Sequence, residues 1–165
     1  MVDSRGTLAQ DGRRAERLEL RVPTTATQLP AVRAMAGDLA MRMDYDLDAV
    51  EDLRLAVDEA CATLTSVASG DSPLTVVFET TRAGLHIEAW VPTADGVDVP
   101  RHGFGWAILA TLVDAVDARR STQAEVPGGN GSATPVGLIA MDKYLPGQRP
   151  SGLGEGAGQN LSVAR

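Results

Sequence analysis

This sequence is poor in the residues that build disulfide frameworks and basic binding surfaces. Cys61 is its only cysteine, which excludes an internal disulfide and a zinc site made of several cysteines. The 22 aspartates and glutamates outnumber the 15 lysines and arginines, so the net charge is −7. Such an acidic chain lacks the basic footprint expected for direct binding of DNA or of an anionic membrane.

Long apolar runs are also missing. The longest, WAILATLV, is far shorter than the roughly 20 residues that cross a bilayer. The first residues lack the apolar core of a secretory signal. His86 and His102 are the only histidines and no G-x-S-x-G elbow is present, which disfavours a histidine metal site and a serine hydrolase. We therefore expect a cytoplasmic protein that binds a protein or a small molecule and does not contact a membrane.

The chain has enough apolar residues for one domain. It contains 165 residues, of which 44% are hydrophobic, and this suffices for a single core. Residues 1–16 are polar, and residues 146–165 are rich in glycine, so we expect both to be flexible tails. The domain is predicted to occupy residues 17–145.

Apolar periodicity predicts the elements of this domain. Residues 18–22 alternate leucine or valine with charged residues, as in a half-buried strand. Residues 27–43 carry apolar side chains at spacings of three and four, as in an amphipathic helix. A second helix is expected to begin near Asp48, which would cap it together with Glu51.

The second half of the chain predicts three strands and one more helix. Residues 74–80 and 85–91 are typical of a hairpin around Gly84. Apolar spacing over residues 103–117 predicts a third helix, and residues 134–145 predict a last strand. These helices are too few to cover both faces of a sheet. We predict a two-layer α/β sandwich, with a mixed, mainly antiparallel sheet and helices on one face.

Two candidate sites can be weighed from residue type and spacing. Asp44, Asp46 and Asp48 resemble the start of a calcium loop, but Ala49 and Leu55 replace the required glycine and glutamate, so calcium is excluded. The four residues HGFG open the predicted third helix. The free N–H groups of Gly103 and Gly105 suit a phosphate, although a plain turn has the same composition.

The second helix carries the remaining candidates. Cys61 lies on its apolar stripe, where a small thiol is a common core residue and a redox role is disfavoured. Glu59 lies about 100° round the helix from that stripe. There its carboxylate suits either a general base at a groove or an ordinary solvated residue.

Four stretches together resemble a known family. They are LELRVPTTATQLPAVRAMAGDLA, VEDLRLAVDEACATL, GFGWAILATLVDAV and MDKYL. The chain is similar over residues 18–145 to RsbW-type anti-sigma factors, which are serine-protein kinases of the GHKL ATPase superfamily. The resemblance implies a GHKL-like fold, binding of ATP and magnesium, and Glu59 as the general base. It also implies phosphate contacts from Gly103 and Gly105.

The ATP motifs of that family are altered here. Thr63 stands where the family has the asparagine that holds magnesium, and a hydroxyl reaches less far than an amide carbonyl. Val91 and Pro92 occupy the place of the aspartate that reads adenine, and Asp95 and Gly96 are a displaced remnant of its D-x-G-x-G motif. Losing that aspartate is expected to cost about 1–3 kcal/mol of binding, so ATP affinity should fall at least tenfold.

The resemblance therefore implies sequestration more than catalysis. The leading hypothesis is an anti-sigma factor that sequesters an alternative RNA polymerase sigma factor and is countered by an anti-anti-sigma protein of the STAS type. Family members act as homodimers, and Arg33 matches an arginine that contacts both partners, although a solvated helix residue is as reasonable. The rival is an active kinase of the anti-anti-sigma protein. A third hypothesis is a GHKL-like domain that serves an unrelated partner.

Overall fold

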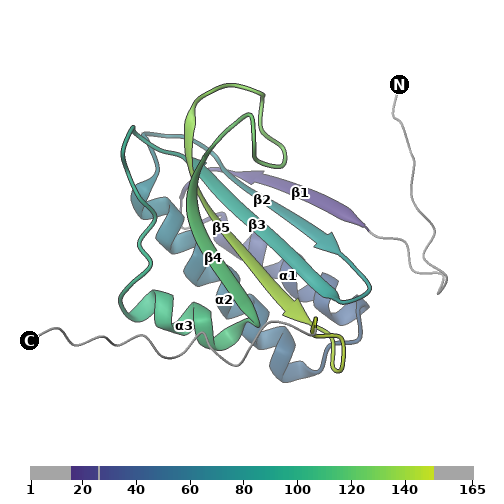
Figure 1. Cartoon of the computed structure of the whole chain (residues 1–165). Coiled ribbons are helices and arrows are strands. Elements are labelled where there is room, and N and C mark those ends of the chain that lie inside the picture. The colour runs from purple at the N-terminus through teal and green to yellow at the C-terminus, as the bar shows by residue number, and fades with distance from the viewer. Residues whose placement is uncertain (1–15, 26, 151–165) are drawn as a thin grey trace, which may run out of the picture.

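In the part of the chain that the structure describes, three helices pack on one face of a five-stranded sheet (Figure 1). The computed structural model describes residues 16–25 and 27–150. The predicted tails lie almost wholly outside the described residues, so their flexibility stays a prediction. The elements, in chain order, are β1 (Arg17–Val22), α1 (Leu29–Arg42), α2 (Leu47–Val67), β2 (Leu74–Thr80), β3 (Gly84–Pro92), α3 (Phe104–Leu112), β4 (Ala115–Thr122) and β5 (Pro135–Tyr144).

The sheet has the strand order β1-β2-β3-β5-β4, and every neighbouring pair is antiparallel. This confirms the predicted two-layer fold and its mainly antiparallel sheet. β1 and β4 are the two edge strands. Across the described residues, none of the helices combines the length and the apolar character needed to cross a lipid bilayer.

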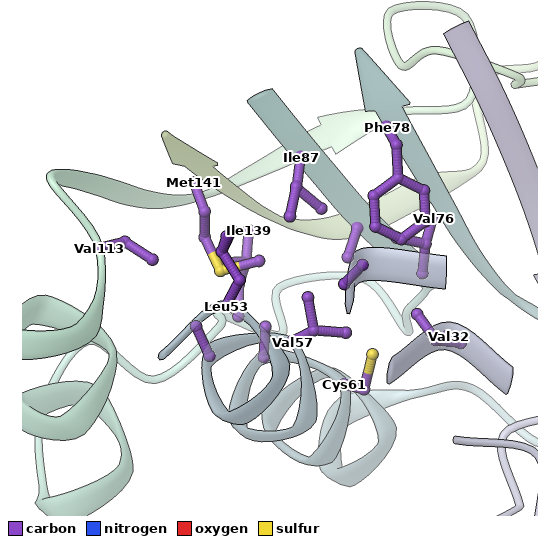
Figure 2. Packing of buried hydrophobic residues seen from close by; sticks show 14 of the residues in the cluster. Val32, Leu53, Val57, Cys61, Val76, Phe78, Ile87, Val113, Ile139 and Met141 are labelled. Atoms are coloured by element: carbon purple, nitrogen blue, oxygen red, sulfur yellow. The ribbon is translucent and has the colours of Figure 1, made fainter. Parts of the chain in front are cut away.

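The main core lies between the helices and the sheet. Leu53, Val57 and Cys61 point from α2 toward the sheet, where Ile139 and Met141 of β5 meet them (Figure 2). The side chain of Cys61 is buried, with 1% of its surface exposed, which confirms its expected place on the apolar stripe. Burial of this layer removes apolar surface from water and so fixes α2 at the centre of the domain.

A smaller apolar cluster covers part of the opposite face of the sheet. The Trp90 side chain of β3 donates a hydrogen bond of 2.9 Å from Nε1 to the carbonyl of Pro127. Residues 123–134, which join β4 to β5, therefore fold back over this face. The cluster comprises Trp90, Val126, Val136, Leu138 and Ala140.

The predicted third helix was too long. Residues 103–117 match a helical period, but α3 ends at Leu112 and residues 115–122 form strand β4. Residues 115–122 form a strand because each of them pairs with a residue of β5. This long-range pairing outweighs the local helical period. The predicted order of elements therefore lacked one strand.

The predicted cap of the second helix was also displaced. Asp46, and not Asp48, precedes the first residue of α2, and its Oδ1 accepts a hydrogen bond of 2.8 Å from the Ala49 N–H. Asp48 instead lies in the first turn, where its negative charge interacts favourably with the positive end of the helix dipole.

Candidate functional site

The candidate site lies where α2 meets α3. A methyl group at Gly105 would lie 3.0 Å from Oε2 of Glu59, so this carboxylate rests against the first turn of α3. Thr63 lies one turn further along α2, on the same helical face and half-buried. The structure thus brings three of the predicted site residues together at one seam.

Gly103 caps α3 at this seam. Its φ of 90° lies in the region that residues with a Cβ avoid, so a glycine is required at this position. No side chain caps the first turn of α3 within the described residues. The free N–H groups of this turn and the positive end of the helix dipole therefore belong to the same turn that the Glu59 carboxylate contacts at Gly105.

The neighbouring acid on α2 faces the other way. Asp58 Oδ2 forms an ion pair with Arg33 of α1, so Asp58 points to α1 while Glu59 points to α3. The hydrogen bond and the charge of Asp58 raise the pKa of Arg33 above its usual value. Oδ1 of Asp58 is buried and has no hydrogen-bond partner among the described residues. Arg33 is thus held away from the Glu59 seam.

The end of β3 differs from a polar ligand-binding loop. Val91 has 0% of its surface exposed and belongs to the main core, and Pro92 follows it at the strand end. Asp95 and Gly96 are exposed on a turn, where the Val97 N–H donates to the Ala94 carbonyl at 3.3 Å. The structure therefore does not bring Asp95 and Gly96 together with Glu59 by any contact among the described residues.

Val99 fills the space between the C-terminal end of α2 and β5. A methyl group at Gly137 of β5 would lie 2.7 Å from Val99 Cγ2 and 3.3 Å from Thr93 Cγ2. Val67 of α2 approaches the same point at 3.7 Å. Val99 has only 5% of its surface exposed, so the connection from β3 to α3 inserts this side chain into the core.

Lys143 ties together the elements that form the seam. Its Nζ donates to the Leu112 carbonyl at the C-terminal end of α3, at 2.7 Å, and to Asp52 of α2, at 3.1 Å. Apart from the stretch MDKYL, no sequence pattern singled out this residue. A cation placed at the C-terminal end of a helix is a recurrent stabilising device, so Lys143 fixes α3 against α2.

Metal ligands are sparse in this region. Within residues 16–25 and 27–150, no three histidine, cysteine, aspartate or glutamate side chains gather as a metal site would require. Of the predicted site residues, Glu59 and Thr63 are those on α2 that carry side-chain oxygens.

The comparisons with known proteins agree with this fold. The histidine kinase-like ATPase domain family matches residues 22–130. The chain belongs to this family. The match begins at the last residue of β1 and runs past the end of β4, so it includes both α2 and α3 with the seam between them.

Individual relatives carry names that fit the resemblance. The chain is 38% identical over 100 residues to the anti-sigma-F factor RsbW of Mycobacterium tuberculosis, over 60% of this chain and 59% of that protein. It is 24% identical over 156 residues to the serine-protein kinase RsbW of Bacillus subtilis, over 82% of this chain and 89% of that protein. The Bacillus cereus serine-protein kinase RsbW is 30% identical over 126 residues, over 62% of this chain and 77% of that protein. The predicted resemblance to RsbW proteins is thereby confirmed.

Proposed function

We propose that this protein is an anti-sigma factor that sequesters an alternative RNA polymerase sigma factor. An anti-anti-sigma protein of the STAS type releases the sigma factor by competing for the same anti-sigma factor. The names of the relatives support an anti-sigma or kinase role, and the acidic charge of −7 favours a protein partner over DNA. The chain spans 59% of the length of the mycobacterial relatives, so their partners enter here as part of the proposal.

The packing of Val99 against Gly137 is the observation that favours sequestration over catalysis. In the family, the end of β3 supplies an aspartate that reads adenine, and here Val91 is buried in the core. Val99 packs against Gly137 from the connection that follows β3. These apolar side chains offer no partner for the polar edge of a base, and an unsatisfied donor weakens binding. We therefore expect weak binding of ATP at this position, and sequestration needs no nucleotide.

Arg33 is the proposed contact to the sigma factor. It lies on α1 with 49% of its side chain exposed, and Asp58 holds it in one orientation. An exposed cation whose position is already fixed loses less conformational entropy when a partner binds. We also propose that the protein acts as a cytoplasmic homodimer, as the family does.

Two observations favour the rival hypothesis, an active serine kinase of the anti-anti-sigma protein. Glu59 retains the place of the general base against Gly105 at the start of α3. The second observation is the Thr93 hydroxyl near Gly137. It is buried and has no partner among the described residues, so it is available to a polar ligand such as a nucleotide. Against this, Thr63 replaces the magnesium-binding asparagine, and Val91 replaces the adenine-reading aspartate.

Binding of an alternative sigma factor, measured with and without ATP and magnesium, tests the proposal. We expect a dissociation constant that changes less than about threefold when nucleotide is added. Arg33→Ala should weaken binding at least about tenfold. The matched control is Arg42→Ala, which removes an arginine of α1 that is also half-exposed and paired with Asp38. Binding that requires ATP, or equal losses in the two variants, would contradict the proposal.

A further inference from the structure

The outer edge of β4 presents backbone groups that face away from the sheet. β4 is an edge strand, and β5 is its only neighbour in the described sheet. The Gln123 N–H donates to the Thr134 carbonyl at 3.0 Å, in continuation of the β4–β5 register. Hydrogen-bonded pairs alternate along an antiparallel ladder. The N–H and C=O groups of Ala118 and Arg120 therefore point outward.

The connection between β3 and α3 runs along this edge in the opposite direction (Figure 1). Asp98 pairs with Arg120 at 3.0 Å, and Arg101 pairs with Asp117 at 3.4 Å. The two ion pairs give the connection the direction and the spacing of an added antiparallel strand. Nevertheless, no backbone hydrogen bond joins it to β4 among the described residues.

Proline removes one of the hydrogen bonds that this pairing would contain. The two ion pairs place Pro100 opposite Ala118, and proline has no N–H to donate to the Ala118 carbonyl. Ala118 has 0% of its surface exposed, and no backbone hydrogen bond to its outward groups is found among the described residues, which costs free energy. A strand with an N–H at that position would remove this cost.

The gap between the connection and the edge is large and basic. It forms an open hollow of about 560 Å³ whose lining carries three arginines and one aspartate, in a chain with a net charge of −7. Arg119 is held by Asp117 at 3.2 Å and by Glu88 at 3.6 Å, whereas Arg120 pairs with the exposed Asp98 alone among the described residues. The hollow is lined by Asp98, Val99, Pro100, Arg101, His102, Ala118, Arg119 and Arg120.

We propose that the outer edge of β4 binds an extended, acidic segment of a protein partner as an added strand. The segment pairs first with the backbone of Arg120 and places a carboxylate where Asp98 now lies. It reaches Ala118 as residues 100–102 move aside, while Val99 keeps its place over Gly137. Adding a strand to a free edge provides main-chain hydrogen bonds, and the arginines select acidic side chains. This surface is separate from Arg33 and from the Glu59 seam, so it adds a second contact to the proposed sigma binding.

A capped hexapeptide that alternates glutamate with valine serves as the probe, and a lysine–valine hexapeptide is its control. We expect the acidic peptide alone to bind and to slow hydrogen exchange at the amides of Ala118 and Arg120. Arg120→Gln keeps the N–H and should weaken binding roughly threefold, as expected for an exposed ion pair. Arg120→Pro also removes the outward N–H and should weaken it roughly tenfold. Asp98→Ala frees the edge and should tighten binding.

A substitution on the opposite edge controls for general damage to the sheet. Arg17→Pro introduces proline at the first residue of β1, the other edge strand, and should leave peptide binding unchanged. Unfolding in urea, measured for every variant, identifies any that fail to fold. Three results would each overturn the proposal: equal binding of the two peptides, equal affinity in Arg120→Gln and Arg120→Pro, or no saturable binding of the acidic peptide.

Discussion

The packing of Val99 against Gly137 can be tested by a double-mutant cycle. A methyl group added at Gly137 would lie 2.7 Å from Val99 Cγ2, closer than carbon atoms pack, so Gly137→Ala must displace Val99. Overpacking of a core in this way costs roughly 1–3 kcal/mol of unfolding free energy. Val99→Ala removes two buried methyl groups and should cost about 2 kcal/mol by lost burial and by the cavity left behind.

The double variant should be more stable than the sum of its parts. If the two changes were independent, their losses would add to about 4 kcal/mol. The methyl group added at Gly137 instead occupies space that Val99→Ala vacates, so we expect a combined loss of about 2–3 kcal/mol. The coupling energy is then on the order of 1–2 kcal/mol.

Urea unfolding of the four proteins at one temperature measures this coupling. The backbone entropy change of Gly137→Ala appears in both arms of the cycle and cancels. Additivity within about 0.5 kcal/mol would show that Val99 does not lie over Gly137. The filled space that supports sequestration would then lose its structural basis.

Three further predictions concern buried polar groups. Tyr45→Phe removes the acceptor of the 3.0 Å hydrogen bond from the Leu85 N–H and should lower the unfolding free energy by about 1–3 kcal/mol in urea titrations. Burial raises the pKa of Cys61 to about 12, so native protein should resist a thiol reagent that labels unfolded protein at once. The hydrogen bond to Asp142 raises the pKa of His86, so wild type should lose stability relative to His86→Gln as pH rises above 6.5. A difference in unfolding free energy between the two proteins that does not change with pH would refute this.

The layers of the fold could be predicted because most elements carry their own period. Leu53, Val57 and Cys61 predicted the buried stripe of α2, and all three face the sheet. Strand β4 escaped prediction because Val113 and Val116 also fit a helical period, and only pairing with β5 separates the two readings. Local patterns do not contain that pairing.

The candidate site, like the fold, could be predicted only in part from the sequence. Helical geometry placed Glu59 beside the apolar stripe, and the structure brings it against Gly105. Consecutive helix residues lie 100° apart, which agrees with Asp58 pointing to Arg33 while Glu59 points to α3, but no local pattern predicted the pairing of Asp58 with Arg33. Val99 lies in a connection without periodicity, so its insertion over Gly137 depends on contacts between residues distant in sequence. No sequence pattern signals such a contact.

Calorimetric titration with ATP and magnesium, on wild type and on Glu59→Ala, tests most directly whether the protein works by sequestration alone. We expect a dissociation constant weaker than about 100 μM for both proteins, because the resemblance implies that Val91 stands in place of the adenine-reading aspartate, and Val99 packs against Gly137. Binding by wild type tighter than that value, with phosphate transfer to an anti-anti-sigma protein that Glu59→Ala abolishes, would contradict sequestration and establish the kinase.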